Sequence, residues 1–470
     1  MNAWKKNRGI TRRLLVKGDL VLESPAHFGG DSNSLTDMPV LLDPLENRAL
    51  LPGSSLAGAL RAYLRQRDVG YRRQSLSNSL DRQMFDGMTD GEGDQSYLII
   101  HNALARGGKP GMELRDGVMI DPSTRTAEDE KKFDFELLQA GLVFPLQFEL
   151  LLTRENQHAL VEAFCIALQG FERGEIALGA RKHRGFGKCS VKNWQVADFD
   201  LSRPAELGAW LKRDERAYKS ATSMSSFLQY NGNRDARELL EISGKFLLST
   251  PLLIRSTSAK PISPDAVHLR STRDGKNTPI ISGTSIAGVL RGHTLRIANT
   301  LQISDSTGLV EGIFGPKLEK GVNNARASRI WVDETVIARH QDAGWVQNRV
   351  KIDRFTGGSY TTALFDEQPY FPDSDEVSLS FRFEDPQPRE IGLLLLALKD
   401  MWLSDLPLGG ESSVGRGRLA GKNLKIRWQR PAQVQEWEIR ITENGKIKVT
   451  GSEVDALEAF VTALRGGQHE

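Results

Sequence analysis

Cysteine is scarce in this sequence, and long apolar runs are missing. The chain of 470 residues has two cysteines, Cys165 and Cys189, without CxxC spacing and without a nearby set of histidines. A zinc site is therefore disfavoured, and we expect both thiols to be reduced and structural. The sequence lacks a run of about 18 uncharged apolar residues that would mark a membrane span. Residues 1–8 lack the apolar core of a signal peptide, so we expect a cytoplasmic protein without membrane contact.

An excess of one charge is also missing. Lysine and arginine number 62 against 60 aspartates and glutamates, and the resulting net charge of +2 does not by itself favour nucleic acid as a partner. Hydrophobic residues at 39% and charged residues at 26% are typical of a soluble globular protein. Because 470 residues exceed what one hydrophobic core normally supports, we expect two domains.

A long internal repeat is what the sequence does contain. Residues 51–61 (LPGSSLAGALR) recur as residues 281–291 (ISGTSIAGVLR), 230 positions later. A second glycine motif, at residues 184–188 and 414–418, repeats at the same distance of 230, and a shorter match (MFDG and IFG) lies between them. The period is far longer than that of a solenoid repeat. The repeat therefore predicts a duplicated domain, whose halves we call the first and second copy.

The repeat also predicts the domain boundaries. We expect a first domain over 1–201, a polar helical linker over 202–243, a second domain over 244–425 and an appendage over 426–470. In the appendage, hydrophobic alternation on both sides of an Asn-Gly pair predicts a hairpin, and a helix is expected to follow it.

Each copy shows the same order of predicted elements. An alternating strand opens it, at 13–22 and at 245–248, and a helix begins at the Gly-Ser motif. An apolar helix, at 159–171 and at 391–402, leads into a Gly-rich loop. Strand–helix–strand units of this kind indicate an α+β fold, a split βαβ or ferredoxin-like core with a half-exposed antiparallel sheet. Such sheets bind single-stranded RNA well.

The Gly-Ser motif is a candidate phosphate site. Ser54 or Ser55 can cap the first turn of the predicted helix, with Thr284 and Ser285 in the same role in the second copy. Free N–H groups and hydroxyls at a helix N-terminus also bind phosphate, and Gly53 allows close approach of the backbone. Helix caps that bind no phosphate are common. Anion binding is favoured here because the motif is duplicated and each copy also has a Gly-rich loop.

The Gly-rich loops, 178–188 and 408–418, supply the basic side chains. Their glycines allow backbone amides to point at phosphates, and their arginines and lysines add counter-charge. A single GxG with arginines is more often a solvated turn, and neither loop fits a dinucleotide or Walker fingerprint. The candidate RNA-binding residues are Gly53, Ser54, Ser55, Arg61, Arg181, Lys182, His183, Arg184 and Lys188 in the first copy, and Gly283, Thr284, Ser285, Arg291, Arg416 and Arg418 in the second.

Three segments of the first copy carry a family resemblance. Residues 23–31 (ESPAHFGGD), residues 37–40 leading to residues 52–56, and the Gly-rich loop before Lys188 resemble the RAMP superfamily, specifically the backbone (Cas-seven group) subunits of type III CRISPR effector complexes. The likeness spans most of both copies. It implies two modified RNA-recognition folds in tandem, as in gene-fused type III-D variants.

The resemblance also implies partners. Backbone subunits of this family stack along a guide RNA, and a protruding thumb hairpin of each kinks the guide. We place the thumbs at 115–132 and 341–362. The expected partners are guide RNA, complementary target RNA and other effector subunits.

An aspartate before the Gly-Ser helix cleaves target RNA in the family, and Asp37 matches that position. A carboxylate there can assist attack of a ribose 2′-hydroxyl on the adjacent phosphate or help hold a divalent cation, expected to be Mg²⁺. Asp31 and Asp43 are alternatives, and His27 matches a family histidine that can contact RNA. The plainer interpretation is that Asp37 caps a turn.

The second copy departs from the pattern, because the segment that follows its first strand lacks the His and Gly-Gly of the first copy. Asp265 is the candidate for a second cleavage residue, with His268 and Asp274 as weaker candidates. Two other functions stay open. One is a scaffold that grips guide RNA without cutting, and the other is the related endoribonuclease that processes guide precursors, which does not typically carry paired Gly-Ser helices.

Overall fold

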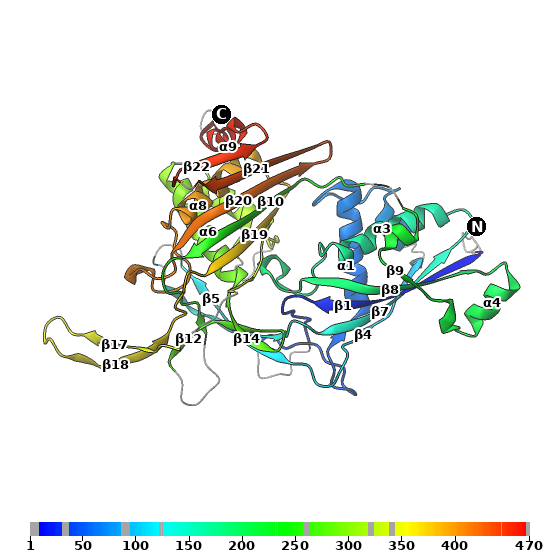
Figure 1. The fold of residues 1–470 in the computed structure, drawn as a ribbon, viewed down its shortest axis with the longest axis horizontal. Helices are drawn as coiled ribbons and strands as arrows, with labels where there is room; N and C mark the ends of the chain where they lie inside the picture. The colour runs from blue at the N-terminus through cyan, green and yellow to red at the C-terminus, as the bar shows by residue number, and fades with distance from the viewer. Residues whose placement is uncertain are drawn as a thin grey trace. The chain divides into compact units, whose positions relative to one another are not determined.

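The computed structural model divides into two compact units. It describes residues 9–30, 37–85, 95–121, 124, 126–230, 232, 234–256, 264–317, 324–337, 344–442 and 444–466. The N-terminal unit comprises Met1–Glu113, Glu136–Lys182 and Phe186–Arg237, and the C-terminal unit comprises Leu114–Phe135, His183–Gly185 and Glu238–Glu470. The C-terminal unit therefore includes two segments from the first half of the chain (Figure 1).

An antiparallel sheet forms the centre of the N-terminal unit. Its order is β3 (Leu98–Ile100), β7 (Val143–Leu152), β1 (Arg12–Leu22), β8 (Cys189–Asp200) and β9 (Lys219–Ala221). Residues of β1 alternate between buried and half-buried, as expected of a strand with one face on the core. Four of these strands lie side by side in the order β8, β1, β7, β3. Numbered along the chain, this is the order 4-1-3-2, which is the ferredoxin-like arrangement.

Helices complete this unit. α1 (Gly53–Val69) and α3 (Gln157–Glu172) pack on one another, with the short α2 (Leu80–Phe85) beside them. α3 is apolar on most sides, and ten of its residues are buried, so it lies in the core rather than on the surface. The remaining elements are α4 (Pro204–Leu211), α5 (Met224–Phe227), β2 (Leu50–Leu51) and β4 (Ala103–Leu104).

The C-terminal unit repeats this plan. The sheet order is β15 (Ile330–Val332), β19 (Glu376–Glu384), β10 (Leu239–Leu248), β20 (Leu419–Arg430), β21 (Gln433–Ile441) and β22 (Ile447–Gly451). Its first four members again follow the ferredoxin-like order. The helices are α6 (Gly283–Thr300), α7 (Ser306–Phe314), α8 (Pro388–Trp402) and α9 (Asp455–Gly466), and α9 lies against α8 beside the β21–β22 end of the sheet (Figure 1).

Long hairpins project from the repeated fold. β5 (Met112–Ile120) pairs with β6 (Ala127–Leu138), and β17 (Gln347–Ile352) pairs with β18 (Ser359–Gln368), which Figure 1 shows in yellow extending from the C-terminal unit. They lie where the thumbs are predicted. Smaller strands are β11 (Arg255–Ser256), β12 (Ala266–His268), β13 (Arg270–Arg273), β14 (Lys276–Ile281) and β16 (Thr335–Val336).

The structure differs from the expected boundaries at two points. β10 begins at Leu239, five residues before the predicted start of the second domain, and β9 within the predicted linker joins the N-terminal sheet. In the appendage, β21, β22 and α9 extend the C-terminal unit, and Trp437 and Phe460 are buried in its core. Among the described residues, no helix is long and apolar enough to cross a membrane.

Candidate nucleic-acid interface

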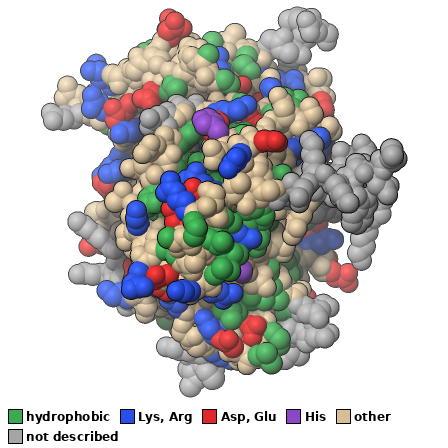
Figure 2. Space-filling view, turned by 90° about the vertical axis from the view of Figure 1, so that its right-hand side faces the viewer, with side chains coloured by type: hydrophobic (Ala, Val, Ile, Leu, Met, Phe, Trp, Pro, Cys, Tyr) green, Lys and Arg blue, Asp and Glu red, His purple; other side chains and the backbone are tan. Residues whose placement is uncertain are grey.

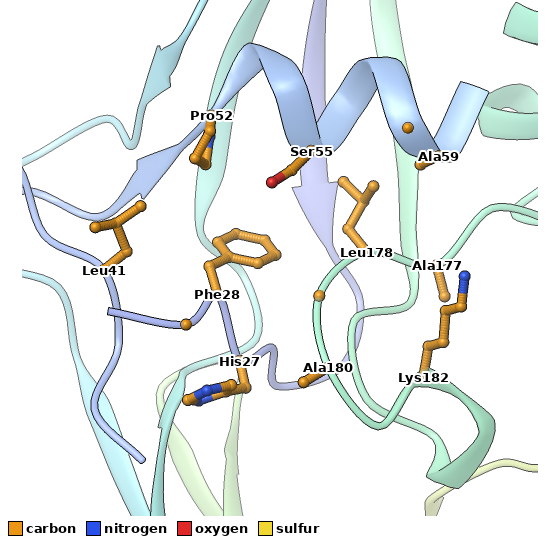
Figure 3. Close-up of a pocket in the computed structure, with 13 residues that line it drawn as sticks. His27, Phe28, Leu41, Pro52, Ser55, Ala59, Ala177, Leu178, Ala180 and Lys182 are labelled. Atoms are coloured by element: carbon orange, nitrogen blue, oxygen red, sulfur yellow. The ribbon is translucent and has the colours of Figure 1, made fainter. Parts of the chain in front are cut away.

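A cavity of about 390 Å³ lies between the Gly-Ser helix and the Gly-rich loop of the N-terminal unit. Figure 3 shows Ser55 on α1, with Phe28 below it and with Leu178 and Ala180 on the loop beside them. His27 and Lys182 also line it. The predicted helix start, the loop after the first strand and the Gly-rich loop therefore come together around one cavity.

The glycines of the Gly-rich loop serve the fold itself. The N–H of Ala180 donates to the carbonyl of His27 at 2.9 Å, and the N–H of Gly187 donates to the carbonyl of Pro25 at 2.8 Å. A Cβ at Gly179 would overlap the carbonyl oxygen of His27. The expectation that these amides point at phosphates is wrong for Ala180 and Gly187, because their N–H groups already bind protein carbonyls.

Glu136 links His27 to the segment that follows Asp37. The ring Nδ1 of His27 lies 2.9 Å from the carbonyl of Glu136, and the Glu136 carboxylate accepts the N–H of Val40 at 3.1 Å. The N–H of Glu136 donates to the carbonyl of Met38 at 3.0 Å. The carbonyl of Glu136 thus binds His27, while its carboxylate and N–H bind the segment that follows the exposed Asp37.

His27 has a defined proton arrangement. A carbonyl oxygen only accepts hydrogen bonds, so Nδ1 must carry the proton that binds Glu136. In the neutral imidazole Nε2 is then an acceptor. His27 is buried, yet it lines the cavity. Its Nε2 can therefore accept a hydrogen bond from a hydroxyl group that enters the cavity.

The predicted basic residues of the first copy separate into two groups. Lys182 lines the cavity, and Arg181 reaches Met38 with its guanidinium 3.9 Å from the sulfur. Burial lowers the pKa of Arg181. Arg61 instead lies 3.9 Å from the buried Asp81. On the face of the molecule in Figure 2, basic and acidic side chains are interspersed.

The remaining basic residues are not among those that line the cavity. His183 and Arg184 belong to the segment that is part of the C-terminal unit. Lys188 accepts the N–H groups of Glu23 and Ser24 at its carbonyl, 2.8 and 3.3 Å away, where β8 begins. Of the predicted basic residues, Lys182 therefore lines the cavity, and Arg181 lies close to the loop that carries Asp37.

The caps of the two Gly-Ser helices differ from the expectation. Pro52, not Ser54 or Ser55, is the N-cap of α1, and the side chain of Asn102 accepts the N–H of Gly53 at 2.8 Å. Ser54 and Ser55 are exposed within the first turn, where their hydroxyls face solvent or the cavity.

In the second copy the cap is Ser282. Its hydroxyl accepts the N–H of Ser285 at 3.2 Å, and it also bonds the hydroxyls of Thr284 and Ser285. The prediction that Thr284 or Ser285 caps α6 is therefore wrong. Because these hydroxyls form hydrogen bonds with one another, the start of α6 is less suited to binding phosphate than the start of α1.

Backbone pairing gives Asp265 the position of Asp37. The N–H of Leu41 donates at 2.7 Å to the loop that follows β1, and the N–H of Leu269 donates at 2.8 Å to the loop that follows β10. Asp37 and Asp265 each lie four residues before these bonds. Both aspartates are exposed. The shared position supports the pairing of the two residues.

The surroundings of Asp265 differ from those of Asp37. The Asp265 carboxylate accepts the N–H of Asp366 from β18 at 3.0 Å. Leu253 occupies the place of His27, because its carbonyl accepts the N–H of Gly410 at 2.8 Å. The second copy therefore has no imidazole at this described position.

His268 is a structural histidine. Its side chain is buried, and Nδ1 accepts the N–H of Ile254 at 3.3 Å. Burial lowers the pKa of His268 to about 3. The imidazole is therefore neutral near pH 7 and lies inside the domain, which does not fit a role in RNA cleavage.

The other alternative aspartates serve turns. Asp43 accepts the N–H groups of Leu45 and Glu46 at 3.0 and 2.8 Å. Asp274 has a φ of 49° at the turn between β13 and β14, next to a glycine, as in a tight hairpin. Asp31 lies outside the described residues.

Arginines of the second copy are engaged within the protein. Arg416 is buried, and its guanidinium lies 2.9 Å from Glu367 and 2.5 Å from Gln347. Arg418 donates to the carbonyl of Ser404 at 2.6 Å. Arg291 donates to the carbonyl of Gly315 at 2.7 Å, and burial lowers its pKa. Arg416 thus links the Gly-rich loop to the β17–β18 hairpin.

Two residues of the first copy were missed by sequence reasoning. Glu136 lies in a run of charged residues, where alternation does not distinguish it from its neighbours. Asn102 was missed because it lies 232 residues before Glu334, whereas the Gly-Ser motifs repeat at a distance of 230. The described residues contain no group of three or more His, Cys, Asp or Glu side chains placed to hold a metal ion.

The fold and cavity define a class of protein. Two ferredoxin-like domains in tandem, each with a Gly-Ser helix against a Gly-rich loop and a projecting hairpin, make a duplicated RNA-recognition-type chain. The family model of the RAMP superfamily matches residues 19–190 and again residues 245–420, and the chain belongs to this superfamily. The predicted family and fold class are confirmed.

Two curated relatives share the name CRISPR system Cms endoribonuclease Csm3. The protein of Methanocaldococcus jannaschii is 22% identical over 251 residues, covering 49% of this chain and 96% of the relative. The protein of Streptococcus thermophilus is 27% identical over 215 residues, covering 42% of this chain and 96% of the relative. A whole relative thus corresponds to about half of this chain, consistent with the duplication.

Proposed function

We propose that this chain is a double backbone subunit of a type III CRISPR effector complex, which binds guide RNA and takes part in cutting complementary target RNA. The observation that carries the proposal is the RAMP match of both copies, together with the likeness to two endoribonucleases. Guide RNA, target RNA and other effector subunits are the proposed partners. Base pairing with the guide would set the target, as in other RNA-guided systems.

The cavity of the first copy supports the RNA-binding part of this proposal. Lys182 supplies positive charge, and the exposed hydroxyls of Ser54 and Ser55 lie at the N-terminus of a 17-residue helix. Helix N-termini attract phosphate through their dipole and N–H groups. The phosphate backbone of the guide is therefore the proposed ligand on this face.

Asp37 is the proposed cleavage residue of the first copy. Its carboxylate can take the proton of a ribose 2′-hydroxyl as that oxygen attacks the adjacent phosphate, a reaction that ends in a 2′,3′-cyclic phosphate and a free 5′-hydroxyl. His27 would orient the RNA by accepting a hydrogen bond at Nε2. Glu136 would act as a positioning residue, because it fixes both the imidazole and the loop after Asp37.

A divalent cation fits this arrangement only in part. Mg²⁺ is often held by one or two carboxylates together with substrate phosphates, so Asp37 would contribute one ligand and the RNA the others. Such an ion would neutralise charge on the phosphate. Asp37 does not belong to a described cluster of three metal-binding side chains, which fits an ion that arrives with the RNA.

Cleavage by the assembled complex tests the proposal. Wild type, Asp37→Asn and Asp265→Asn are assembled with guide RNA and incubated with labelled complementary target in magnesium. We expect Asp37→Asn to lose one discrete product by about 100-fold or more, the usual size of a general acid–base contribution, while target binding is kept.

Asp43→Asn is the matched control, because it changes a carboxylate of the same loop that caps a turn, and asparagine caps as well as aspartate. Its products should be unchanged. Persistence of every product in Asp37→Asn would contradict the cleavage role and leave a guide-binding scaffold. Absence of RNA binding in the wild-type complex would contradict the backbone role itself.

The scaffold function is the second candidate for the second copy. Leu253 in place of His27 and the bond from Asp265 to the β18 backbone favour it. In the same experiment, unchanged products for Asp265→Asn would assign that copy to binding alone.

A further inference from the structure

The sheet of the C-terminal unit has a polar side that faces away from the core. Leu424, Ile426 and Trp437 are buried in the core, and the residues that alternate with them along β20 and β21 point to the other side. We call this side the outer face. It consists of Ser378 and Ser380 on β19, Ser243 and Lys245 on β10, Asn423 and Lys425 on β20, Glu438 and Arg440 on β21, and Lys448 and Thr450 on β22. Each of these residues is exposed or half-buried.

Backbone pairing places basic side chains of the outer face in one row. Lys245 pairs with Asn423, which pairs with Arg440 on β21. Arg440 pairs in turn with Lys448 on β22, the last strand of the sheet. Directly paired residues point to the same face, and neighbouring strands lie about 4.8 Å apart. The row therefore crosses the sheet over roughly 14 Å, with Lys425 two residues further along β20.

Positive charge predominates on the outer face. Its four basic residues are exposed, and its single carboxylate, that of Glu438, accepts a hydrogen bond from Asn423 at 2.7 Å. In the next row of the sheet, Arg427 binds the carboxylates of Glu241 and Glu436 at 2.9 and 3.3 Å. The neighbouring acidic groups are thus neutralised by a different cation, and the basic row keeps its charge.

The first copy has the opposite charge at the equivalent of Lys245. Glu23 and Ser249 correspond, because the N–H of each donates to the last carbonyl of the Gly-rich loop of its copy. Four residues earlier stand Asp19 in the first copy and Lys245 in the second. Asp19 binds Arg106 at 2.6 Å. The basic row is therefore not a feature that the two copies share.

Protein covers the corresponding face of the N-terminal unit. Lys17 of β1 binds Glu215 at 2.8 Å, and its ammonium lies 4.0 Å from the ring centroid of Tyr218. The guanidinium of Arg13 lies 4.3 Å from the ring centroid of Trp210. The segment that follows β8 thus lies on the outward side chains of β1, whereas the outward basic side chains of the second copy are exposed.

Most of the basic row lies beyond the family match. The RAMP model ends at residue 420, and β21 and β22 follow that position. Lys425, Arg440 and Lys448 are therefore residues that the family model does not include.

We propose that the outer face of the second copy binds single-stranded RNA through its phosphates, as a second site besides the cavity of the N-terminal unit. A strand that crosses from β10 to β22 would meet Lys245, Arg440 and Lys448 in turn. The other members of the row are Ser378 and Asn423, so bases find no aromatic ring to stack on, and binding has no base preference. The proposal goes beyond the proposed function, because it requires neither a guide nor cleavage.

The composition of the outer face favours a nucleic acid over a folded protein as its partner. Protein interfaces depend on a few aromatic or aliphatic side chains that become buried at their centre. The outer face has only serine, threonine, asparagine, lysine, arginine and glutamate. Affinity for a nucleic acid can come from neutralised phosphates and released counterions alone, and such binding weakens steeply as salt is added.

Fluorescence anisotropy of the full chain with a labelled poly(U) oligonucleotide tests the proposal. The dissociation constant is measured between about 50 and 200 mM NaCl, where phosphate contacts have a large effect. We expect the double variant Arg440→Gln and Lys448→Gln to bind about tenfold more weakly at the lowest salt. Each lost phosphate contact lowers the slope of log K against log salt by about 0.7, so the slope should fall by about 1.4.

A second double variant, Arg389→Gln and Lys399→Gln, is the matched control. It removes the same charge from exposed positions of α8, a helix that packs on the core side of the sheet. Its affinity and salt slope should equal those of the wild type. Thermal unfolding of each variant shows whether a loss of binding comes from a loss of folding.

Three results would overturn the proposal. One is an equal affinity and salt slope for the outer-face variant and the α8 control, and another is a wild-type chain that does not bind poly(U) at the lowest salt. The third is displacement of the RNA by poly-glutamate as readily as by unlabelled poly(U) at equal charge, which would assign the outer face to an acidic protein. Guide-dependent cleavage is measured separately in the assembled complex, so each result leaves the proposed function to its own assay.

Discussion

Gly185 and Gly415 occupy equivalent positions in two loops of nearly equal backbone conformation, yet their environments differ. Gly185 is buried against the backbone of Glu334, and Gly415 has open space beside it among the described residues. The same contrast holds for the starts of α6 and α1. The two copies therefore keep the same elements but differ in which of them are buried. The start of α6 is covered by protein, and the start of α1 borders a cavity.

Removing the charge of Glu334 should have the largest effect on stability. Glu334→Gln leaves Arg115 and Arg273 without their carboxylate in a buried site, and breaking such a pair costs about 3–5 kcal/mol. We expect calorimetry to show an earlier unfolding transition of the C-terminal unit. Asn102→Ala, at the equivalent exposed position, removes one hydrogen bond to Gly53 and should cost about 1 kcal/mol. Equal losses for the two variants would remove the distinction between a covered and an open helix start.

A methyl group at Gly283 should have the next largest effect. Gly283→Ala forces Cβ into the carbonyl oxygens of Val332 and Arg184, and overpacking of this kind costs about 1–3 kcal/mol. Gly288→Ala lies one turn and a half further along α6 with open space, and should stabilise the helix by up to about 1 kcal/mol. Urea unfolding of both variants gives the comparison. A stable Gly283→Ala would mean that the loop does not press on α6.

Protonation of His268 should have the smallest effect on the stability of the C-terminal unit near pH 7. Burial lowers the pKa of His268 from 6.5 to about 3, so the unfolded chain binds a proton more readily than the folded one. The contribution of His268 is fully present above about pH 6.5, and stability falls by about 1.4 kcal/mol per pH unit as the pH drops from there toward 3. His268→Gln should remove this part of the slope in unfolding measured at pH 7, 6 and 5.

Val40 occupies the position of His268 in the first copy. Each lies three residues after the aspartate (Asp37 or Asp265) and one residue before the leucine whose N–H bonds the loop after the first strand. The N-terminal unit should therefore lack this contribution. An equal acid sensitivity in His268→Gln and wild type would assign the slope to other groups.

Local periodicity explains what could be predicted from the sequence. The strand at β1, the helices α1 and α6 and the β21–β22 hairpin were predictable because each depends on neighbours within a few residues. The thumb positions were expected from the family resemblance instead. The repeat added the order of the domains, because one register joined distant motifs. Asp265 was expected to correspond to Asp37 because it lies close to the Gly-Ser motif of the second copy.

Contacts between distant residues explain what could not be predicted. Arg115 and Glu334 are 219 residues apart, and nothing in either neighbourhood specifies the other. Pro52 caps α1 in place of a serine because Asn102, from another strand, binds the first N–H. The amide of Ala180 was expected to be available for phosphate, but it binds a carbonyl on a loop that folds back from the start of the domain.

The C-terminal unit contains segments from both halves of the chain, and this has a consequence for biosynthesis. A ribosome adds roughly 5–20 residues per second, so Arg115 leaves the ribosome on the order of 10–40 seconds before Glu334 exists. Throughout that interval Arg115, which is buried in the complete chain, lacks the carboxylate that binds it there. A nascent chain interrupted before Glu334 would therefore carry a finished sheet and an unfinished hairpin, and cutting the gene at its midpoint would not yield two independent domains.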